Sequence, residues 1–232
     1  MHWYLNYRGK KMKKYLLTLA ILIGFNGVIS AQFKLPSIPS NPLSSDKSEP
    51  SGDVNASQEA LMSKVADAIG DTLAAQALIA EAQGKAELAA TLNNTSSKLK
   101  GGDPSNDDIK GAVLLTKDTA AEQKEVFSAG EAMSGGSKAL YGKALLPYIK
   151  AVAKTAKLKD PISNFMKDAQ STLKTTRNPM KLTKLKKTLD TGLFVGKNVP
   201  KLIVSLGTSA KDLMSFAKKN DLDTSGADDI EL

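Results

Sequence analysis

The sequence predicts an all-α helical bundle of about five to six helices, with one long Ala-rich helix packed on shorter basic helices. Three observations indicate this fold. Apolar residues recur at helical spacing through most of the chain after residue 57. No stretch of useful length alternates apolar and polar residues as a strand does. Gly- and Pro-containing breaks separate the periodic segments, as they do between packed helices.

Residues 1–31 have the order of a signal peptide. Lys13 and Lys14 precede an uncharged, mostly apolar run of 11 residues, Tyr15 to Phe25, and small residues close the segment at Ala31. A membrane span needs about 20 apolar residues, so we expect cleavage near Ala31, with a retained anchor as the alternative. Met12 makes the more compact start, which would leave residues 1–11 as an extension. A leader of this kind directs the protein to the periplasm or the exterior of a bacterium.

Residues 32–56 form a Pro- and Ser-rich linker to a predicted helical domain at residues 57–220. Pro36, Pro39 and Pro42 follow one another at every third position, a spacing that suits an extended polyproline-like tether.

The first predicted helix of the bundle starts at Ser57 and carries a stripe of small apolar residues. Its members alternate between steps of four and three along the chain: Leu61, Val65, Ala68, Thr72, Ala75, Ile79, Ala82, Ala86 and Ala89. This is the seam of a helix packed nearly parallel or antiparallel to a neighbour. We favour a helix inside the bundle, with a coiled-coil surface between chains as the alternative. Asn93 to Asn106 breaks the pattern, with a loop at Gly101 to Pro104.

The middle of the domain holds two longer helices. One runs from the acidic pair Asp107 and Asp108 to about Met133. The next covers residues 138–158 and contains Pro147, where apolar spacing on both sides favours one kinked helix over two.

Three shorter helices have clear starting signals. Asp160-Pro161, Asn178-Pro179 and Val199-Pro200 each place Pro at the first helical position. Asn220 is a candidate left-handed C-cap, and residues 221–232 form an acidic tail that we expect to be flexible.

The charge is unevenly distributed along the chain. Residues 138–220 hold 18 basic and 4 acidic groups, net +14, and 17 of the 18 are Lys. Residues 32–137 are net −6 and residues 221–232 are net −5. The basic half could be neutralised within the fold, or it could present a positive face to an anionic partner.

The residues after Ala31 include no Cys, His or Trp. They therefore supply no thiol nucleophile, imidazole base, or thiolate or imidazole metal ligand. We expect a non-enzymatic protein without a cofactor or metal. Glu81 with Glu122, Glu125 or Glu131 could pair across two helices, but a di-metal bundle also needs His.

The acidic tail partly resembles a calcium-binding loop. Asp221, Asp223, Ser225 and Gly226 match its first, third, fifth and sixth positions. The bidentate Glu expected at position 12 is absent, because Glu231 falls one position early and the chain ends at Leu232. The sequence therefore favours a solvated tail over a calcium site.

The basic helices are the best candidate site. The residues expected to contact an anionic surface are Lys181, Lys184, Lys186, Lys187, Lys174 and Arg177. An apolar stripe flanked by Lys can lie on an anionic membrane, although the same pattern describes any solvated bundle helix. Specific nucleic-acid binding is not expected, because Arg and interleaved aromatic residues are scarce.

The sequence thus predicts an exported, periplasmic or secreted helical protein that binds a protein partner or an anionic envelope surface. Once the leader is removed, any membrane contact would be transient. The alternative is a carrier or sensor of a small amphiphile, held between the Ala-rich helix and the Leu-rich short helices.

Export should remove the leader after Ala31, or within about two residues of it, because the apolar run is too short to span a bilayer. Mass spectrometry of the exported protein should then give a chain that starts near Gln32. Recovery of a membrane-bound chain with residues 13–31 intact would contradict this prediction.

Overall fold

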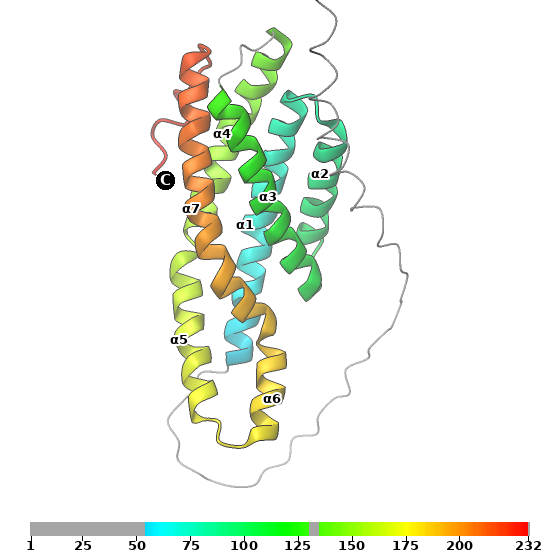
Figure 1. The fold of residues 1–232 in the computed structure, drawn as a ribbon, viewed down its shortest axis with the longest axis vertical. Helices are drawn as coiled ribbons and strands as arrows, with labels where there is room; N and C mark the ends of the chain where they lie inside the picture. The colour runs from blue at the N-terminus through cyan, green and yellow to red at the C-terminus, as the bar shows by residue number, and fades with distance from the viewer. Residues whose placement is uncertain (1–53, 130–134, 232) are drawn as a thin grey trace, which may run out of the picture. The chain divides into compact units, whose positions relative to one another are not determined.

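The computed structural model describes residues 54–129 and 135–231, and their fold is an all-α bundle (Figure 1), as the periodicity predicts. The predicted signal peptide and residues 32–53 of the predicted linker lie outside the described residues. The helices of the described residues are α1 (Val54–Ala82), α2 (Ala86–Lys100), α3 (Asn106–Ala129), α4 (Gly135–Ala156), α5 (Lys159–Thr175), α6 (Pro179–Thr188) and α7 (Asp190–Lys219).

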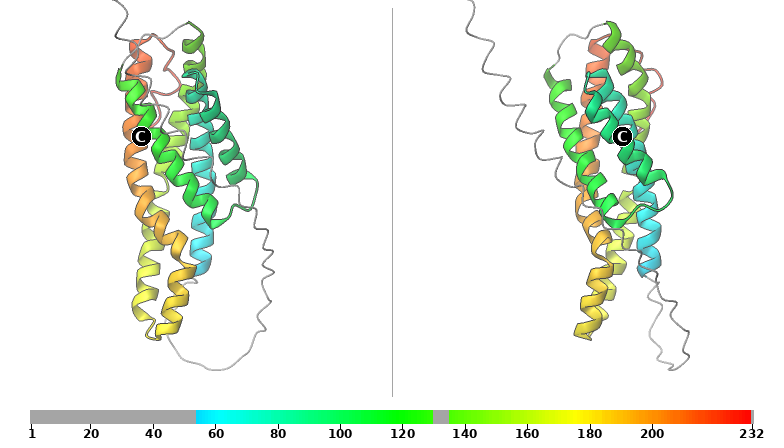
Figure 2. Two further views of the ribbon diagram at one scale, coloured as in Figure 1. Left: turned by 45° about the vertical axis from the view of Figure 1, so that its right-hand side comes forward. Right: turned by 90° about the vertical axis from the view of Figure 1, so that its right-hand side faces the viewer.

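Helix α1 lies at the centre of the bundle and packs against α2, α3, α4 and α5 (Figures 1 and 2). Helices α4 and α5 follow one another along one side, and α6 and α7 return in the opposite direction, with α3 alongside α7. All the described residues belong to one unit that begins at residue 49. None of the helices in the described ranges is long and apolar enough to cross a membrane.

The small-residue stripe is buried within the chain, as expected for an internal bundle helix. Val65, Thr72 and Ile79 have no exposed surface, and all the stripe residues except Ala86 are buried. Short side chains allow neighbouring backbones to approach closely. The Ser96 hydroxyl of α2 accordingly donates a hydrogen bond of 2.7 Å to the backbone carbonyl of Gly70 in α1.

The prediction that one helix carries the whole stripe is wrong, because α1 ends at Ala82. Gly84 adopts a positive φ of 72°. The Lys85 N–H donates to the Ala80 carbonyl at 2.8 Å, and the Gly84 N–H donates to the Glu81 carbonyl at 2.9 Å. This pair of bonds is a Schellman ending, which satisfies the last carbonyls of α1 and reverses the chain into α2. Helix α2 then continues through Asn93, where the sequence predicts a break.

Buried glutamines join α1 to α3. Gln76 Nε2 donates to the Thr116 carbonyl at 3.0 Å, and Gln123 Nε2 donates to the Gln76 carbonyl at 2.9 Å. Both side chains have no exposed surface. Because an unpaired amide is costly in a core, these bonds favour one register of α1 against α3.

Two of the three predicted starts for the short helices are wrong. Helix α5 begins at Lys159 rather than at Pro161, and no side chain caps it, because it follows α4 almost without a break. Helix α7 begins at Asp190 and continues through Pro200, since Val199 and Leu202 on either side are both in the core. The start at Asn178-Pro179 is confirmed: the Asn178 side chain accepts hydrogen bonds from the N–H groups of Met180 and Lys181.

The prediction for Pro147 is confirmed, and the prediction for the cap at Asn220 is wrong. Helix α4 runs through Pro147 as one helix, as predicted. Asn220 has an ordinary φ of −104°, so the prediction that it is left-handed is wrong; the left-handed residue is the next one, Asp221, with φ 55°.

The acidic tail forms hydrogen-bonded turns in the structure. Ala227 is buried, and Gly226 lies against the Leu146 side chain of α4. Asp228 forms an ion pair of 2.8 Å with Lys218 at the end of α7. The tail therefore packs at the end of the bundle opposite to α6 (Figure 1).

Replacing Gly192 by Ala should destabilise the protein by about 1–3 kcal/mol, because the added methyl would overlap the Phe165 ring and lie 2.7 Å from Gln58 Oε1. Gly192→Ala would also disturb the hydrogen bond of 3.2 Å from the Gly192 N–H to the same Gln58 oxygen. The measurement is chemical denaturation.

The matched control is Gly207→Ala in the same helix, where an added methyl meets nothing within 4 Å. This variant should be more stable than wild type by roughly 0.5 kcal/mol, since Ala is the better helix former. Equal stabilities of the two variants would contradict the close packing at Gly192.

Candidate functional site

The six predicted contact residues lie together on the hairpin formed by α5 and α6. Lys174 and Arg177 lie at the end of α5 and in the turn, and Lys181, Lys184, Lys186 and Lys187 lie on α6. All six side chains are exposed. We call these six residues the basic hairpin tip. In Figures 1 and 2 this hairpin occupies one end of the bundle, beyond the start of α1.

The basic hairpin tip contains no acidic residue within its stretch of sequence, and Asp190, which follows it, is paired with Lys110. Residues 169–189 contain six basic and no acidic residues. None of the six forms an ion pair with another described residue. Lysines elsewhere in the described ranges do find partners, including Lys85 with Glu122 at 2.6 Å and Lys98 with Asp108 at 2.6 Å. The positive charge of the tip is therefore not neutralised by contacts within the fold.

Local sequence explains how α6 forms in this position. Asn178 caps the helix, Pro179 supplies a fixed φ for its first turn, and Lys186 and Lys187 lie in the last turn, where the helix dipole favours cations. A helix of 10 residues is marginal alone, so α6 depends on packing against α5 and α7.

The packing of α6 is slight. None of its residues is buried. Leu182 and Leu185 are half-buried, with Leu185 packed against the core, and Met180 in the first turn is 76% exposed. The hairpin thus presents one large apolar side chain among its cations, a combination typical of surfaces that contact lipid headgroups.

Ion pairs elsewhere in the described residues join neighbouring helices, and only those of Lys154 pair a base of the basic half with acids of the acidic half. Lys154 of α4 pairs with Asp71 and, at 2.7 Å, with Asp67, both on α1, and Lys100 of α2 also pairs with Asp71. Lys110 of α3 pairs with Asp190 of α7. These contacts hold neighbouring helices together, and the contacts of Lys154 also remove a small part of the charge asymmetry of the sequence.

The Asp71 cluster shifts the pKa values of its members. Burial by itself raises the pKa of Asp71, but hydrogen bonds and charges from Lys100 and Lys154 outweigh it and hold that pKa below its usual range. Burial lowers the pKa of Lys154, and the Asp67 and Asp71 carboxylates outweigh that effect and raise it.

The calcium-loop carboxylates serve local hydrogen bonds instead. Asp223 Oδ1 accepts from the Ser225 N–H at 3.0 Å and from its hydroxyl at 2.7 Å, and Asp228 accepts from Thr224 and Lys218. Within residues 54–129 and 135–231, no group of three Asp, Glu, His or Cys side chains converges as a metal site would require.

The candidate glutamates that the structure describes lie on the surface of the bundle. Glu122 is paired with Lys85, Glu81 and Glu125 are exposed surface residues, and Glu131 lies outside the described residues. Comparison with protein-family models, curated proteins and solved structures finds no match to this chain.

Replacing Asp71 by Asn should lower stability at pH 7 by roughly 0.5–1 kcal/mol, the range for a partly exposed ion pair. Because the folded pKa of Asp71 is lowered, its contribution is complete above the unfolded pKa and is lost as pH falls through the folded pKa. Melting temperatures of wild type and Asp71→Asn should therefore converge in acid, once the pH has fallen below the usual pKa of an Asp carboxyl and through the lowered pKa of Asp71.

Asp118→Asn is the control, because Asp118 is exposed and forms no ion pair among the described residues. It should leave the melting temperature nearly unchanged at both pH values. A difference between wild type and Asp71→Asn that persists at low pH would show that the ion pairs are not its cause.

Proposed function

We propose that this protein is an exported, non-enzymatic helical protein that binds an anionic envelope surface through the basic hairpin tip. The single observation that carries the proposal is the grouping of six exposed basic residues, with no acidic residue between 169 and 189 and no ion pair to any described residue. Export rests on the leader at residues 1–31, and the absence of enzymatic activity on the lack of Cys, His and Trp after it.

The chemistry of the tip favours a lipid surface over a specific anionic site. Five of its six cations are Lys, which act as solvated point charges, whereas bidentate recognition of a defined phosphate favours Arg. Each Lys near an anionic membrane contributes about 1 kcal/mol of attraction. Met180, exposed in the first turn of α6, adds an apolar group that can enter the headgroup region.

The slight packing of α6 also suits this role. A helix with no buried residue can tilt or shift against α5 and α7 without opening the core. The bundle would thus hold the hairpin at its end while the hairpin adapts to the surface.

The full-length protein should bind vesicles of phosphatidylglycerol and phosphatidylcholine at low salt, and the binding should fade as salt rises. The screening length falls from about 10 Å at 0.1 M salt to about 3 Å at 1 M. The combined variant Lys181→Gln, Lys184→Gln, Lys186→Gln and Lys187→Gln should bind at least about tenfold more weakly in a sedimentation assay. Gln is nearly as good a helix former as Lys, so helical content should not change.

The matched control replaces four exposed lysines that form no ion pair among the described residues: Lys64, Lys117, Lys124 and Lys143. Both variants lose the same charge and keep the same leader, so a difference between them reports on the hairpin alone. Equal losses would mean that net charge, not this site, drives binding, and would overturn the proposal. So would wild-type protein that ignores anionic vesicles at low salt.

A further inference from the structure

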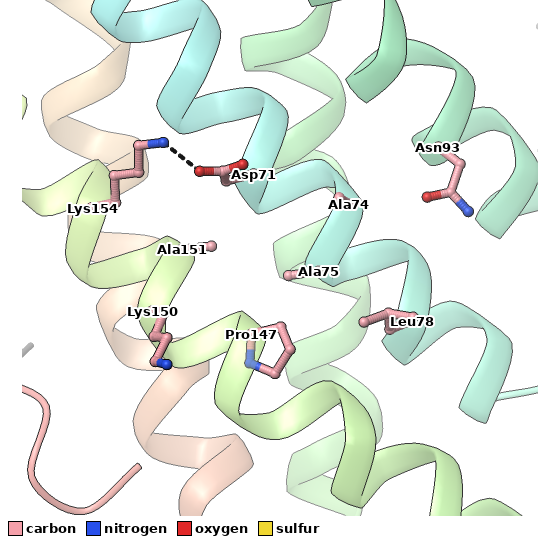
Figure 3. A pocket seen from close by; sticks show the side chains of 9 residues that line it. All are labelled: Asp71, Ala74, Ala75, Leu78, Asn93, Pro147, Lys150, Ala151 and Lys154. Atoms are coloured by element: carbon pink, nitrogen blue, oxygen red, sulfur yellow. Dashed lines mark hydrogen bonds and ion pairs between the residues drawn. The ribbon is translucent and has the colours of Figure 1, made fainter. Parts of the chain in front are cut away.

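A groove between α1 and α4 forms a second candidate site, separate from the basic hairpin tip (Figure 3). Its volume is about 430 Å³, within the range of small-molecule sites of roughly 300–1,000 Å³. Ala74, Ala75 and Leu78 of α1 line one side, and Pro147 and Ala151 of α4 line the other. Because most of these side chains are short, they leave an open space between the two helices, and the groove is lined mainly by apolar groups.

Pro147 lies on the α4 side of the groove, at a position where its presence in a helix needs an explanation. Proline within a helix costs about 3 kcal/mol, because it removes one backbone hydrogen bond and clashes with the preceding turn. Its neighbours Ala144 and Tyr148 are buried in the core, but the Pro147 side chain is exposed. Core packing therefore does not account for proline at this position, whereas a rigid apolar wall for the groove does.

The rim of the groove carries an excess of positive charge. Asp71 lies at one end, but it is paired with both Lys100 and Lys154 (Figure 3 shows the contact with Lys154). Lys150 lines the same groove, is exposed, and forms no ion pair with another described residue. Asn93 of α2 adds an exposed amide at the rim. The groove thus combines an apolar floor with one available cation and a neutral donor.

We propose that this groove binds a single-chain anionic amphiphile of the long-chain carboxylate class. The alkyl chain would lie along the alanines, Leu78 and Pro147, where each buried methylene should strengthen binding about fourfold. The carboxylate would lie at the α4 edge of the groove and accept a hydrogen bond from Lys150, on the side away from Asn93 (Figure 3). A cationic headgroup would meet Lys150 and Lys154 and be repelled. This proposal is independent of membrane binding by the basic hairpin tip.

The test is isothermal titration calorimetry of the full-length protein with dodecanoate below its micelle concentration. Wild type should bind one dodecanoate at this site, octanoate at least about tenfold more weakly, and dodecyltrimethylammonium not detectably. Lys150→Gln should weaken dodecanoate binding by about tenfold or more, as expected for one charge-assisted hydrogen bond. Lys143→Gln, an exposed lysine of the same helix outside the groove, should have no effect.

Filling the groove provides a second measurement. Ala74→Phe places a ring over the floor and should abolish dodecanoate binding, whereas Ala121→Phe on the exposed face of α3 should not. Circular dichroism melting checks that both Phe variants fold. If Ala74→Phe does not fold, the comparison of Lys150→Gln with Lys143→Gln tests the proposal. Equal binding by Lys150→Gln and Lys143→Gln, or equal binding of the cationic amphiphile, would overturn the proposal.

The two sites can be separated by exchanging the assays. The variant of α6 with four Lys→Gln substitutions should keep its dodecanoate binding, and Ala74→Phe should keep its vesicle binding. Loss of both activities in either variant, with an unchanged circular dichroism melt, would contradict a separate groove site.

Discussion

The close packing of the small residues of α1 is the constraint on which the rest of the structure depends. Ala68, Ala75 and Ala77 are buried in the core, so neighbouring helices can approach the α1 backbone on several sides. The same shortness of side chain has a second effect where the interface of α1 with α4 reaches the surface. There the short side chains leave the groove between α1 and α4, because small residues on both helices cannot fill the space between them.

The distribution of charge follows from this arrangement. Packing α1 on α4 brings Asp67 and Asp71 to Lys154, and packing α3 along α7 brings Lys110 to Asp190. These pairs join the acidic and basic halves of the sequence. Six of the remaining unpaired cations lie together at the hairpin of α5 and α6, whereas the acidic tail packs at the opposite end, where Asp228 pairs with Lys218. The 30 residues of α7, about 45 Å of helix, lie between the tip and the tail, so the tail is well beyond a screening length of about 10 Å and cannot quench the tip.

The hairpin and the groove illustrate two ways of building a surface on one bundle. Helix α6 contributes no buried residue, so its sequence is free to carry cations and an exposed Met180. Helix α4 must fill the core with Ala144, Leu145 and Tyr148, so only its outer face is available. Lys150 and Pro147 both lie on that outer face.

The sequence by itself determined the all-α class, the burial of the α1 stripe, the cap at Asn178 and the grouping of the six basic residues, because these depend on local spacing and composition. Only the tertiary structure decided where helices end. The stripe stays in phase from Leu61 to Ala89, yet the chain reverses at Gly84, whose positive φ ends α1 and lets α2 pack back on it. Pro200 lies inside α7 because the buried residues on both sides outweigh one missing hydrogen bond. The groove was likewise invisible in the sequence, because its walls come from helices 70 residues apart that meet only through packing.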